Sequence, residues 1–456
     1  MAGASRAMHY LFRFLIFPAC LTAVAALLAA CAPAGGGPAA DDRIEIEFWH
    51  GMGGAQGRSI NEIADLFNQS QERYRVAPIY QGNYNSLSQK IIASLYAGRN
   101  PVMAQMYPSW SARYFRYGYL KPVEEFVEAD PGFGSEDIAD FYPIMIEENT
   151  LVNPETGEEI LATLPFNKSV YVLYVNQTRM EELGWEEPPR TWEELAQLAR
   201  EMTEIPEGAS TPTFYGFAAR PFIEDFTVQV LAAGHQLMDE ETGEIYVNTE
   251  ESLEALRFLR RLVAGEVGGR QVGYVESDYL SNVFGSERIG MYISSTASFP
   301  FNDMAVGNKF VWRAYPVPAR DGKTEARTLM QGTNVGIFHG VSEERQQGAW
   351  EFLKFLTSAE MTAKWGIDTG YMPVRRSADD VPAFAEHLER DVRYANAVST
   401  LPRAAFEPRL MYWESVRQAV SREVEAVLLG RTTPEAAMAR AESTIKGIQA
   451  RTIAGQ

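Results

Sequence analysis

The chain has 456 residues, of which 46% are hydrophobic and 12% aromatic, which is typical of a globular protein and predicts two or three domains. Its net charge of −19 argues against nucleic acid and anionic lipid as partners, because both are polyanions. Both cysteines lie within the first 31 residues, so the rest of the chain excludes disulfides, zinc–thiolate sites and cysteine nucleophiles. The five histidines include no pair four residues apart, which argues against a histidine-built metal site.

The beginning of the chain carries an export signal. Arg6 and Arg13 form a short basic start, and an uncharged run of 17 residues follows from Phe14 to Ala30. The run ends Leu-Ala-Ala before Cys31, which predicts a lipobox whose cysteine becomes the acylated first residue. A transmembrane helix is one alternative, but the run is at the lower limit of the ~17–25 residues needed and contains Pro18. A cleaved soluble protein is the other.

We therefore expect a lipoprotein signal peptide at 1–30 and a flexible Gly/Pro/Ala tether at 31–42. The protein is expected outside the cytoplasm, lipid-anchored to the cell membrane on its periplasmic or outer face. Cleavage changes the net charge from −19 to −21, because it removes two arginines and no acid. We interpret this acidity as surface solubility, which does not exclude a small anionic ligand in a buried site.

Strand and helix signals alternate along the remaining chain. Alternating or continuous apolar residues predict strands at 44–48, 74–80, 102–107 and 170–176. Helical spacing predicts helices from Ile60 to Phe67, over 88–97, from a capping box at Thr191, and over 249–263, 349–365 and 415–429, with a turn at 239–243. This order predicts an α/β fold with largely parallel sheets.

The glycine loop from His50 to Gly57 lies where nucleotide-binding loops occur. It fails the P-loop pattern, because Met52 stands in place of a glycine and Arg58 in place of the lysine. The next strand end, at residues 80–82, has no acidic residue for a dinucleotide ribose. We interpret the loop as facing a cleft, where its backbone N–H groups could hold a polar ligand, and expect no cofactor.

Nothing in the chain nominates a catalytic nucleophile, and with 60 acidic residues no carboxylate pair stands out as a glycosidase dyad, so we expect a protein that is not an enzyme. Aromatic residues at strand ends and in loops are better candidates for ligand contact, because such rings stack on sugars or hold cations, although each could equally be lobe packing. They are Trp49, Tyr84, Tyr107, Trp110, Tyr371 and Trp413.

Six short segments and the C-terminal stretch 409–430 carry a resemblance to a known family. The segments are Phe48–Met52, Tyr80–Tyr84, Gln105–Tyr107, Pro165–Ser169, the region around Met291 and Ser295, and Thr369–Pro373. Over residues 43–450 the chain resembles the extracytoplasmic solute-binding proteins of ABC importers, in the sugar-binding family that includes maltose-binding protein. The Gly-Asn-Tyr and Thr-Gly-Tyr-x-Pro pieces are similar to the branch that binds sn-glycerol-3-phosphate.

The resemblance implies a two-lobed periplasmic-binding-protein fold with a ligand cleft between α/β lobes. Lobe 1 is expected at 43–168 plus 330–370, and lobe 2 at 169–329 plus 371–456. Closure on a small-molecule ligand would be recognised by the ABC permease, with the receptor a monomer. The implied ligand-binding residues are Tyr84, Ser169, Ser295, Gly332, Tyr371 and Arg417. Arg417 suits a phosphate, although a helix-surface ion pair with a nearby glutamate is the alternative for this residue.

Two departures from the branch bear on the ligand. Pro108 stands where the branch has a glutamate that holds the glycerol hydroxyls, and residues 216–222 lack the branch's tryptophans. The hypothesis is a receptor for sn-glycerol-3-phosphate or a larger glycerophosphodiester such as glycerophosphocholine. Further candidate contacts are Trp49, Pro108, Trp110, Phe222 and Asp225. The alternatives are a di- or oligosaccharide such as maltose or trehalose, and, more remotely, an exported glycoside or phosphodiester hydrolase.

Overall fold

The computed structural model describes residues 42–454 except 265, 266, 278 and 324. The expected signal peptide, Cys31 and nearly all of the tether lie outside these residues. The chain divides after Arg43, and every element below belongs to the compact unit Ile44–Gln456. None of the described helices combines the length and the apolar character that crossing a membrane requires.

One mixed sheet runs through this unit, with the strand order β2-β1-β3-β12-β7-β10-β8-β9. These strands are β2 (Tyr74–Tyr80), β1 (Ile44–His50), β3 (Met103–Met106), β12 (Thr328–Phe338), β7 (Leu164–Asn176), β10 (Ile289–Ser295), β8 (Tyr215–Ala219) and β9 (Gly273–Val275). Short strands β4 (Leu120–Lys121), β11 (Trp312–Tyr315) and β13 (Ala404–Ala405) pair at its sides, and β5 (Thr150–Val152) forms a separate hairpin with β6 (Glu159–Leu161).

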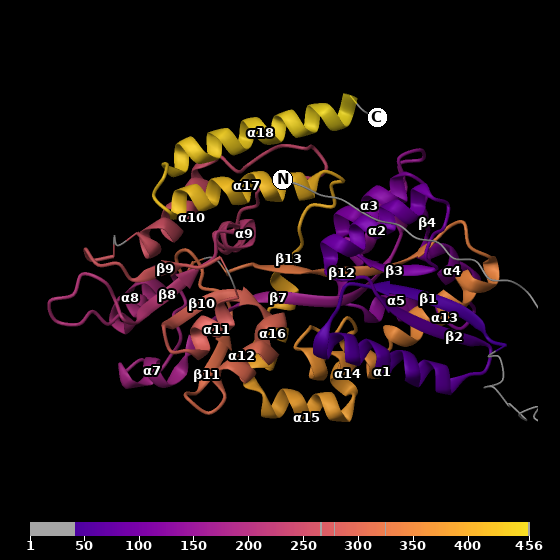
Figure 1. Ribbon diagram of the computed structural model, residues 1–456, viewed down its shortest axis with the longest axis horizontal. Coiled ribbons are helices and arrows are strands. Elements are labelled where there is room, and N and C mark those ends of the chain that lie inside the picture. Colours follow the sequence, from indigo (N-terminus) through magenta and orange to yellow (C-terminus); the bar gives the residue numbers. More distant parts are fainter. Residues whose placement is uncertain (1–41, 265–266, 278, 324, 455–456) are drawn as a thin grey trace, which may run out of the picture. The chain divides into compact units, whose positions relative to one another are not determined.

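The two long central strands connect two lobes. β7 is buried along all 13 residues and pairs antiparallel with β12 at one end and with β10 at the other. The outer pairs β1–β2, β1–β3, β8–β10 and β8–β9 are parallel. The expectation of largely parallel sheets is therefore confirmed only for these outer pairs. It is wrong for the crossing strands, because β12 pairs antiparallel with β3 and β4, and β7 pairs antiparallel with β10, β11 and β12. Figure 1 shows β7 and β12 crossing the middle of the unit.

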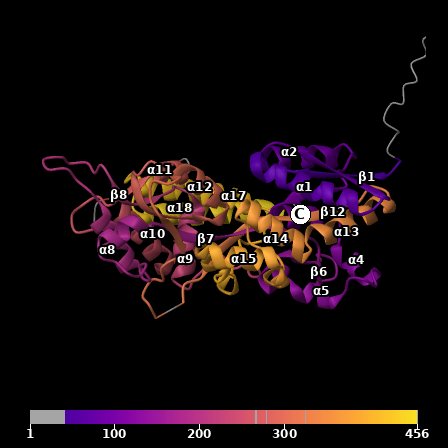
Figure 2. The same ribbon diagram turned by 90° about the horizontal axis from the view of Figure 1, so that it is seen from below.

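The helices cover both sides of the sheet (Figures 1 and 2). Lobe 1 holds α1 (Gly54–Ser70), α2 (Tyr84–Tyr96), α3 (Pro108–Arg116), α4 (Val123–Ala129), α5 (Ser135–Asp140), α6 (Pro143–Asn149), α13 (Glu343–Leu356) and α14 (Ala359–Thr369). Lobe 2 holds α7 (Gln177–Glu182), α8 (Trp192–Met202), α9 (Ile223–Ala232), α10 (Glu250–Val263), α11 (Leu280–Gly285), α12 (Phe299–Val306), α17 (Trp413–Leu428) and α18 (Pro434–Ala454). Helices α15 (Pro382–Arg390) and α16 (Val392–Val398) follow α14. The exact lobe boundaries stay a prediction.

Local signals account for most element ends. The Thr191 hydroxyl accepts a hydrogen bond from the Glu194 amide, and the Glu194 carboxylate accepts one from the Thr191 amide, which confirms the predicted capping box. Two expectations were wrong in detail. Half of the glycine loop is helical, since α1 begins at Gly54, and the single helix expected over 349–365 is interrupted after Leu356. A new cap at Ser358, which accepts from the Met361 amide, starts the second helix.

Candidate ligand-binding site

A cavity of about 490 Å³ lies between the two lobes. Lobe 1 contributes the beginnings of two helices to its wall, residues Asn83–Asn85 and Tyr107–Trp110. The side of lobe 2 contributes Phe222, Tyr279, Glu407, Pro408, Trp413, Glu414 and Arg417. Residues from five separate stretches of the chain thus meet around one space, which is the arrangement of a ligand-binding site.

Five helices begin at this cavity, among them α11, whose N-cap is Tyr279 and whose first turn has no acidic residue. Tyr84 and Pro108 are the first residues of α2 and α3, neither of which has an acidic residue in its first turn. Phe222 caps α9 and Trp413 begins α17, and both of these helices carry glutamate in the first turn. A helix N-terminus has a partial positive charge. Lobe 1 therefore presents two helix ends without an acidic residue, whereas two of the three helix ends of lobe 2, those of α9 and α17, carry glutamate.

An aromatic group forms the lobe 1 wall. The rings of Tyr84 and Tyr107 lie 5.0 Å apart, and that of Trp110 lies 5.2 Å from Tyr107 at 81°. Asn167 of β7 donates a hydrogen bond of 3.0 Å to the Tyr84 hydroxyl and so orients the ring. Opposite them, Phe222 and Tyr279 of lobe 2 are 36% and 77% exposed. The cavity therefore offers packed rings on one side and open rings on the other, a lining that suits a sugar face or a cation.

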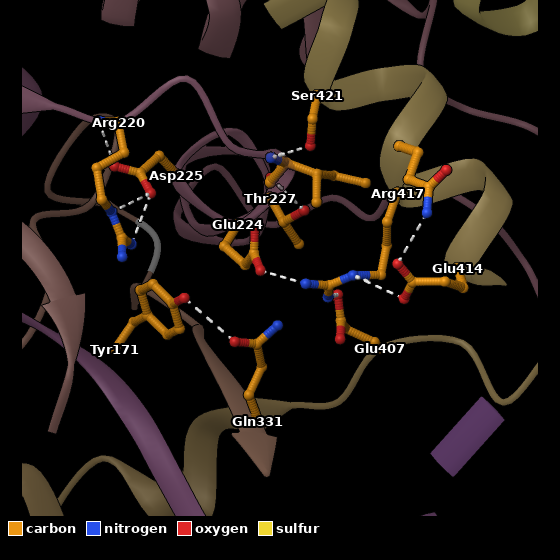
Figure 3. Close-up of polar contacts among 12 residues, drawn as sticks. Tyr171, Arg220, Glu224, Asp225, Thr227, Gln331, Glu407, Glu414, Arg417 and Ser421 are labelled. Atoms are coloured by element: carbon orange, nitrogen blue, oxygen red, sulfur yellow. Dashed lines mark hydrogen bonds and ion pairs between the residues drawn. The ribbon is translucent and has the colours of Figure 1, made fainter. Parts of the chain in front are cut away.

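Arg417 lies at the centre of a charged cluster on lobe 2 (Figure 3). Its guanidinium forms ion pairs with Glu224 at the start of α9 and with Glu407 before α17, and its Nε lies 3.7 Å from Glu414. The Glu407 side chain is almost fully buried. The cluster has three carboxylates for one guanidinium, so Arg417 gives this wall no net positive charge.

The protonation preferences within this cluster follow from burial and pairing. Burial raises the pKa of Glu224, but the attraction of Arg417 and Arg220 outweighs it, and the pKa lies below its ordinary value. For Glu407 burial prevails over the attraction of Arg417, and the pKa is raised. Burial opposes the charge of Arg417, yet both glutamates raise its pKa well above the ordinary value. Arg417 therefore stays charged, and Glu407 is the carboxylate that protonates first on acidification.

The structure brings about half of the expected site residues to the cavity. Tyr84, Pro108, Trp110, Phe222 and Arg417 all line it. The ion pair expected of Arg417 is confirmed, since the side chain pairs with glutamates. Arg417 also lines the cavity, and its contact with a ligand stays a prediction.

Three expected residues lie at the crossing strands beneath. Tyr371 stacks on Trp365, and its hydroxyl, whose pKa burial raises, hydrogen-bonds with Asn167 and Tyr84. The Ser169 hydroxyl donates to the Gln331 carbonyl at 3.3 Å. Gly332 has φ of +136°, and a Cβ there would lie 2.0 Å from the Asn167 carbonyl oxygen. Glycine is required here because the backbone of β7 lies so close to residue 332.

The other three do not line the cavity either. Ser295 begins a 3₁₀ turn, where its hydroxyl accepts from the Ala297 amide. Asp225 is buried and binds the Arg220 guanidinium through two hydrogen bonds of 3.1 and 2.7 Å. The Trp49 indole donates to Glu47 at 3.2 Å.

Sequence reasoning missed Glu224, Glu407 and Tyr279. Glu224 and Asp225 open a helix, a pattern that normally means only dipole compensation. Glu407 precedes Pro408 in a stretch with no motif, and nothing near Tyr279 marks a cavity wall. Tyr107 and Trp413 had an aromatic signal but no assigned role. Within the part of the chain that the structure describes, no cluster of three or more His, Cys, Asp or Glu side chains could hold a metal.

Two α/β lobes that share long crossing strands and enclose a cavity define the class of two-lobed solute-binding proteins. Residues 62–391 match the model of the bacterial extracellular solute-binding proteins, and the chain belongs to that family.

Curated relatives agree with this assignment. The chain is 27% identical over 405 residues to the sn-glycerol-3-phosphate-binding periplasmic protein UgpB of Yersinia pseudotuberculosis, covering 86% of this chain and 90% of that protein. It is 26% identical over 407 residues to UgpB of Escherichia coli K12, with the same coverage.

Solved structures share the fold. UgpB from Mycobacterium tuberculosis, in complex with glycerophosphocholine, superposes with a TM-score of 0.77 at 20% identity, covering 90% of this chain and 99% of that one. The GacH receptor of Streptomyces glaucescens, solved unliganded and with acarbose, gives 0.73 at 18% identity, covering 89% and 98%. At these identities the likeness is one of fold alone.

Proposed function

We propose that this protein is the solute-binding component of an ABC importer and captures a glycerophosphodiester with a cationic head, such as glycerophosphocholine. The lobes close on the ligand, and the closed form delivers it to the permease. The relatives named as sn-glycerol-3-phosphate-binding proteins support a ligand of the glycerol phosphate class. No catalytic step is part of the proposal.

The observation that carries the choice of ligand is the opposite character of the two cavity walls. The helix N-termini of lobe 1 at Tyr84 and Pro108 favour a phosphate, because both line the cavity and neither first turn contains an acidic residue. The lobe 2 wall combines Glu407 and Glu414 with the rings of Phe222 and Trp413, which favours a cation. A zwitterion with its phosphate on lobe 1 and its ammonium on lobe 2 satisfies both walls.

A phosphate monoester is a poorer match to the same cavity. At neutral pH it carries about −1.5 to −2 charges, and the one arginine in the wall is already paired with two carboxylates. The phosphodiester of glycerophosphocholine carries a single negative charge, which the ammonium group of the same molecule balances. sn-Glycerol-3-phosphate is therefore second to a glycerophosphodiester.

A di- or oligosaccharide is the alternative that the aromatic lining favours. Tyr84, Tyr107 and Trp110 could stack on pyranose rings, and Glu407 and Glu414 could accept hydrogen bonds from sugar hydroxyls. A neutral sugar makes no use of the charge difference between the walls, and for that reason we place it second to the zwitterion.

Isothermal titration of residues 43–456 with glycerophosphocholine, sn-glycerol-3-phosphate, maltose and trehalose tests the proposal. We expect glycerophosphocholine to bind the wild type, and Glu407→Gln, which removes a negative charge from the lobe 2 wall, to weaken its binding. Binding of a disaccharide alone would keep the receptor role and refute the ligand. Turnover of a chromogenic glycoside or phosphodiester by the same protein would refute the receptor role.

We place the mature protein outside the cytoplasm, held to the membrane by acylation of Cys31. The support is the sequence pattern of residues 1–31 together with the extracellular family and the periplasmic relatives. Mass spectrometry of the protein purified from membranes should find a diacylated or triacylated N-terminal cysteine. Cys31→Ser should release the protein from the membrane fraction, and an unmodified mature N-terminus in the wild type would refute the anchor.

A further inference from the structure

Residues 406–412 connect β13 to α17 and form a strap between the lobes. Glu407 and Pro408 of this strap, with Trp413 that follows it, line the proposed ligand cavity. The same three residues also line a second cavity of about 410 Å³ on the other side of the strap, which reaches Ile144 and Glu147 of lobe 1. The position of the strap therefore sets the shape of the ligand cavity.

Arg113 of lobe 1 binds the C-terminal end of the strap. This arginine lies in α3, the helix whose first residues line the ligand cavity. Its Nη2 donates a hydrogen bond of 2.7 Å to the carbonyl oxygen of Met411, two residues before α17 begins. Arg113 is in the last turn of α3, where a cation also compensates the helix dipole. The bond to Met411, however, crosses from one lobe to the other.

Arg409 makes the second connection, in the opposite direction. Its Nη1 donates to the carbonyl oxygens of Glu147, at 2.5 Å, and of Thr150, at the C-terminal end of α6 in lobe 1. Its backbone N–H and Nε donate to the Glu240 carboxylate of lobe 2 at 2.7 and 2.6 Å. Because Glu240 holds the guanidinium in place, reaching the α6 carbonyls costs little further side-chain entropy. Both carbonyls lie at a negative helix end, which favours a cation.

We infer that Arg113 and Arg409 are positioning residues that hold lobe 1 against the strap and thereby set how tightly the cavity closes on its ligand. Neither side chain lines the ligand cavity, which Arg417 does, and Arg409 lines only the second cavity. Their contribution to affinity acts through the population of the closed form, because a ligand that needs closure binds more weakly when closure is less favourable. The inference uses the proposed function only for the choice of ligand.

Arg113→Gln, Arg409→Gln and their combination test this role, with Arg440→Gln as the matched control. Arg440 pairs with Glu423 at 2.6 Å between α18 and α17, entirely within lobe 2. Arg113→Gln and Arg409→Gln should each weaken glycerophosphocholine binding by about tenfold to a hundredfold, as expected for the loss of a hydrogen bond from a charged group, and the double variant by more. The control should bind as the wild type does. Lysine variants at both positions serve if a glutamine variant does not fold.

A distance measurement separates this inference from the proposed ligand. Residues 43–456 contain no cysteine, so spin labels can be placed at Tyr96→Cys in lobe 1 and Met304→Cys in lobe 2, which are 85% and 80% exposed. In the ligand-free protein, Arg113→Gln and Arg409→Gln should each shift the distribution of interlobe distances toward longer values, and Arg440→Gln should not. Unchanged distances with unchanged or tighter binding would overturn the inference. If no compound of the panel binds the wild type, the proposed ligand fails, and the ligand-free distances alone decide the inference.

Discussion

Replacing Glu407 by glutamine should change the affinity for two phosphate compounds in opposite directions. Glu407 is 8% exposed, pairs with Arg417 and lines the cavity, so Glu407→Gln removes one negative charge while keeping the size of the side chain. Arg417 is then balanced by fewer carboxylates and attracts a phosphate more strongly. A cationic head on the same wall loses a favourable charge.

Coulomb's law sets the size of the effect. A unit charge about 6 Å from another contributes about 3 kcal/mol at an effective dielectric constant of about 20. The cavity opens to solvent, which reduces this to about 1.4 kcal/mol, or about tenfold in Kd. We expect sn-glycerol-3-phosphate to bind about tenfold more tightly to the variant, and glycerophosphocholine to bind several-fold more weakly.

The assay is isothermal titration at pH 8, because burial raises the pKa of Glu407 and an alkaline pH favours its ionised form. Glu414→Gln is the matched control. Glu414 is half-exposed and approaches Arg417 Nε no closer than 3.7 Å, so solvent screens its charge. A change of the same sign for both ligands, or an equal effect of Glu414→Gln, would refute the charge argument. Wild-type protein at acidic pH should shift toward the behaviour of Glu407→Gln.

Three further predictions concern stability, each measured by urea denaturation. Lys168→Met leaves the fully buried carboxylate of Glu148 without its ion-pair partner and should lower the free energy of unfolding by about 3–5 kcal/mol. Adding Glu148→Leu to this variant should restore most of the lost stability. Equal stabilities of the single and the double variant would contradict this explanation. Burial lowers the pKa of His50 from 6.5 to about 4, so the unfolded state takes up a proton first as the pH falls. Stability should therefore decline by about 3 kcal/mol between pH 6.5 and 4, and His50→Gln should flatten this slope; a slope that persists unchanged would exclude His50 as its source. Gly332→Ala should cost more than about 2 kcal/mol, because its Cβ would meet the Asn167 carbonyl, whereas Gly98→Ala, also at positive φ but with open space around it, should cost about 1 kcal/mol. Comparable losses at the two glycines would show that the backbone contact is not the cause.

Much of the architecture could be read from residues close together in the chain. The alternation in 44–48, the capping box at Thr191 and the spacing in 249–263 each depend on a few neighbouring side chains and match β1, α8 and α10. The place of Arg417 in the cavity wall was expected from the resemblance over residues 43–450. Antiparallel pairing of β7 with β12 could not be read in this way, because no local pattern tells which of two buried strands will be neighbours.

The sequence by itself therefore determined the class of fold, the order of the elements and several residues of the cavity. Only the tertiary structure decided the charge of the cavity wall. Glu224 and Arg417 are 193 positions apart, and Glu407 lies ten positions before Arg417 on a stretch without regular structure. Folding largely buries the two glutamates beside the partly exposed Arg417, and a buried charge without a partner would be costly. Composition and periodicity do not predict which charged residues, distant in the sequence, folding will bring together.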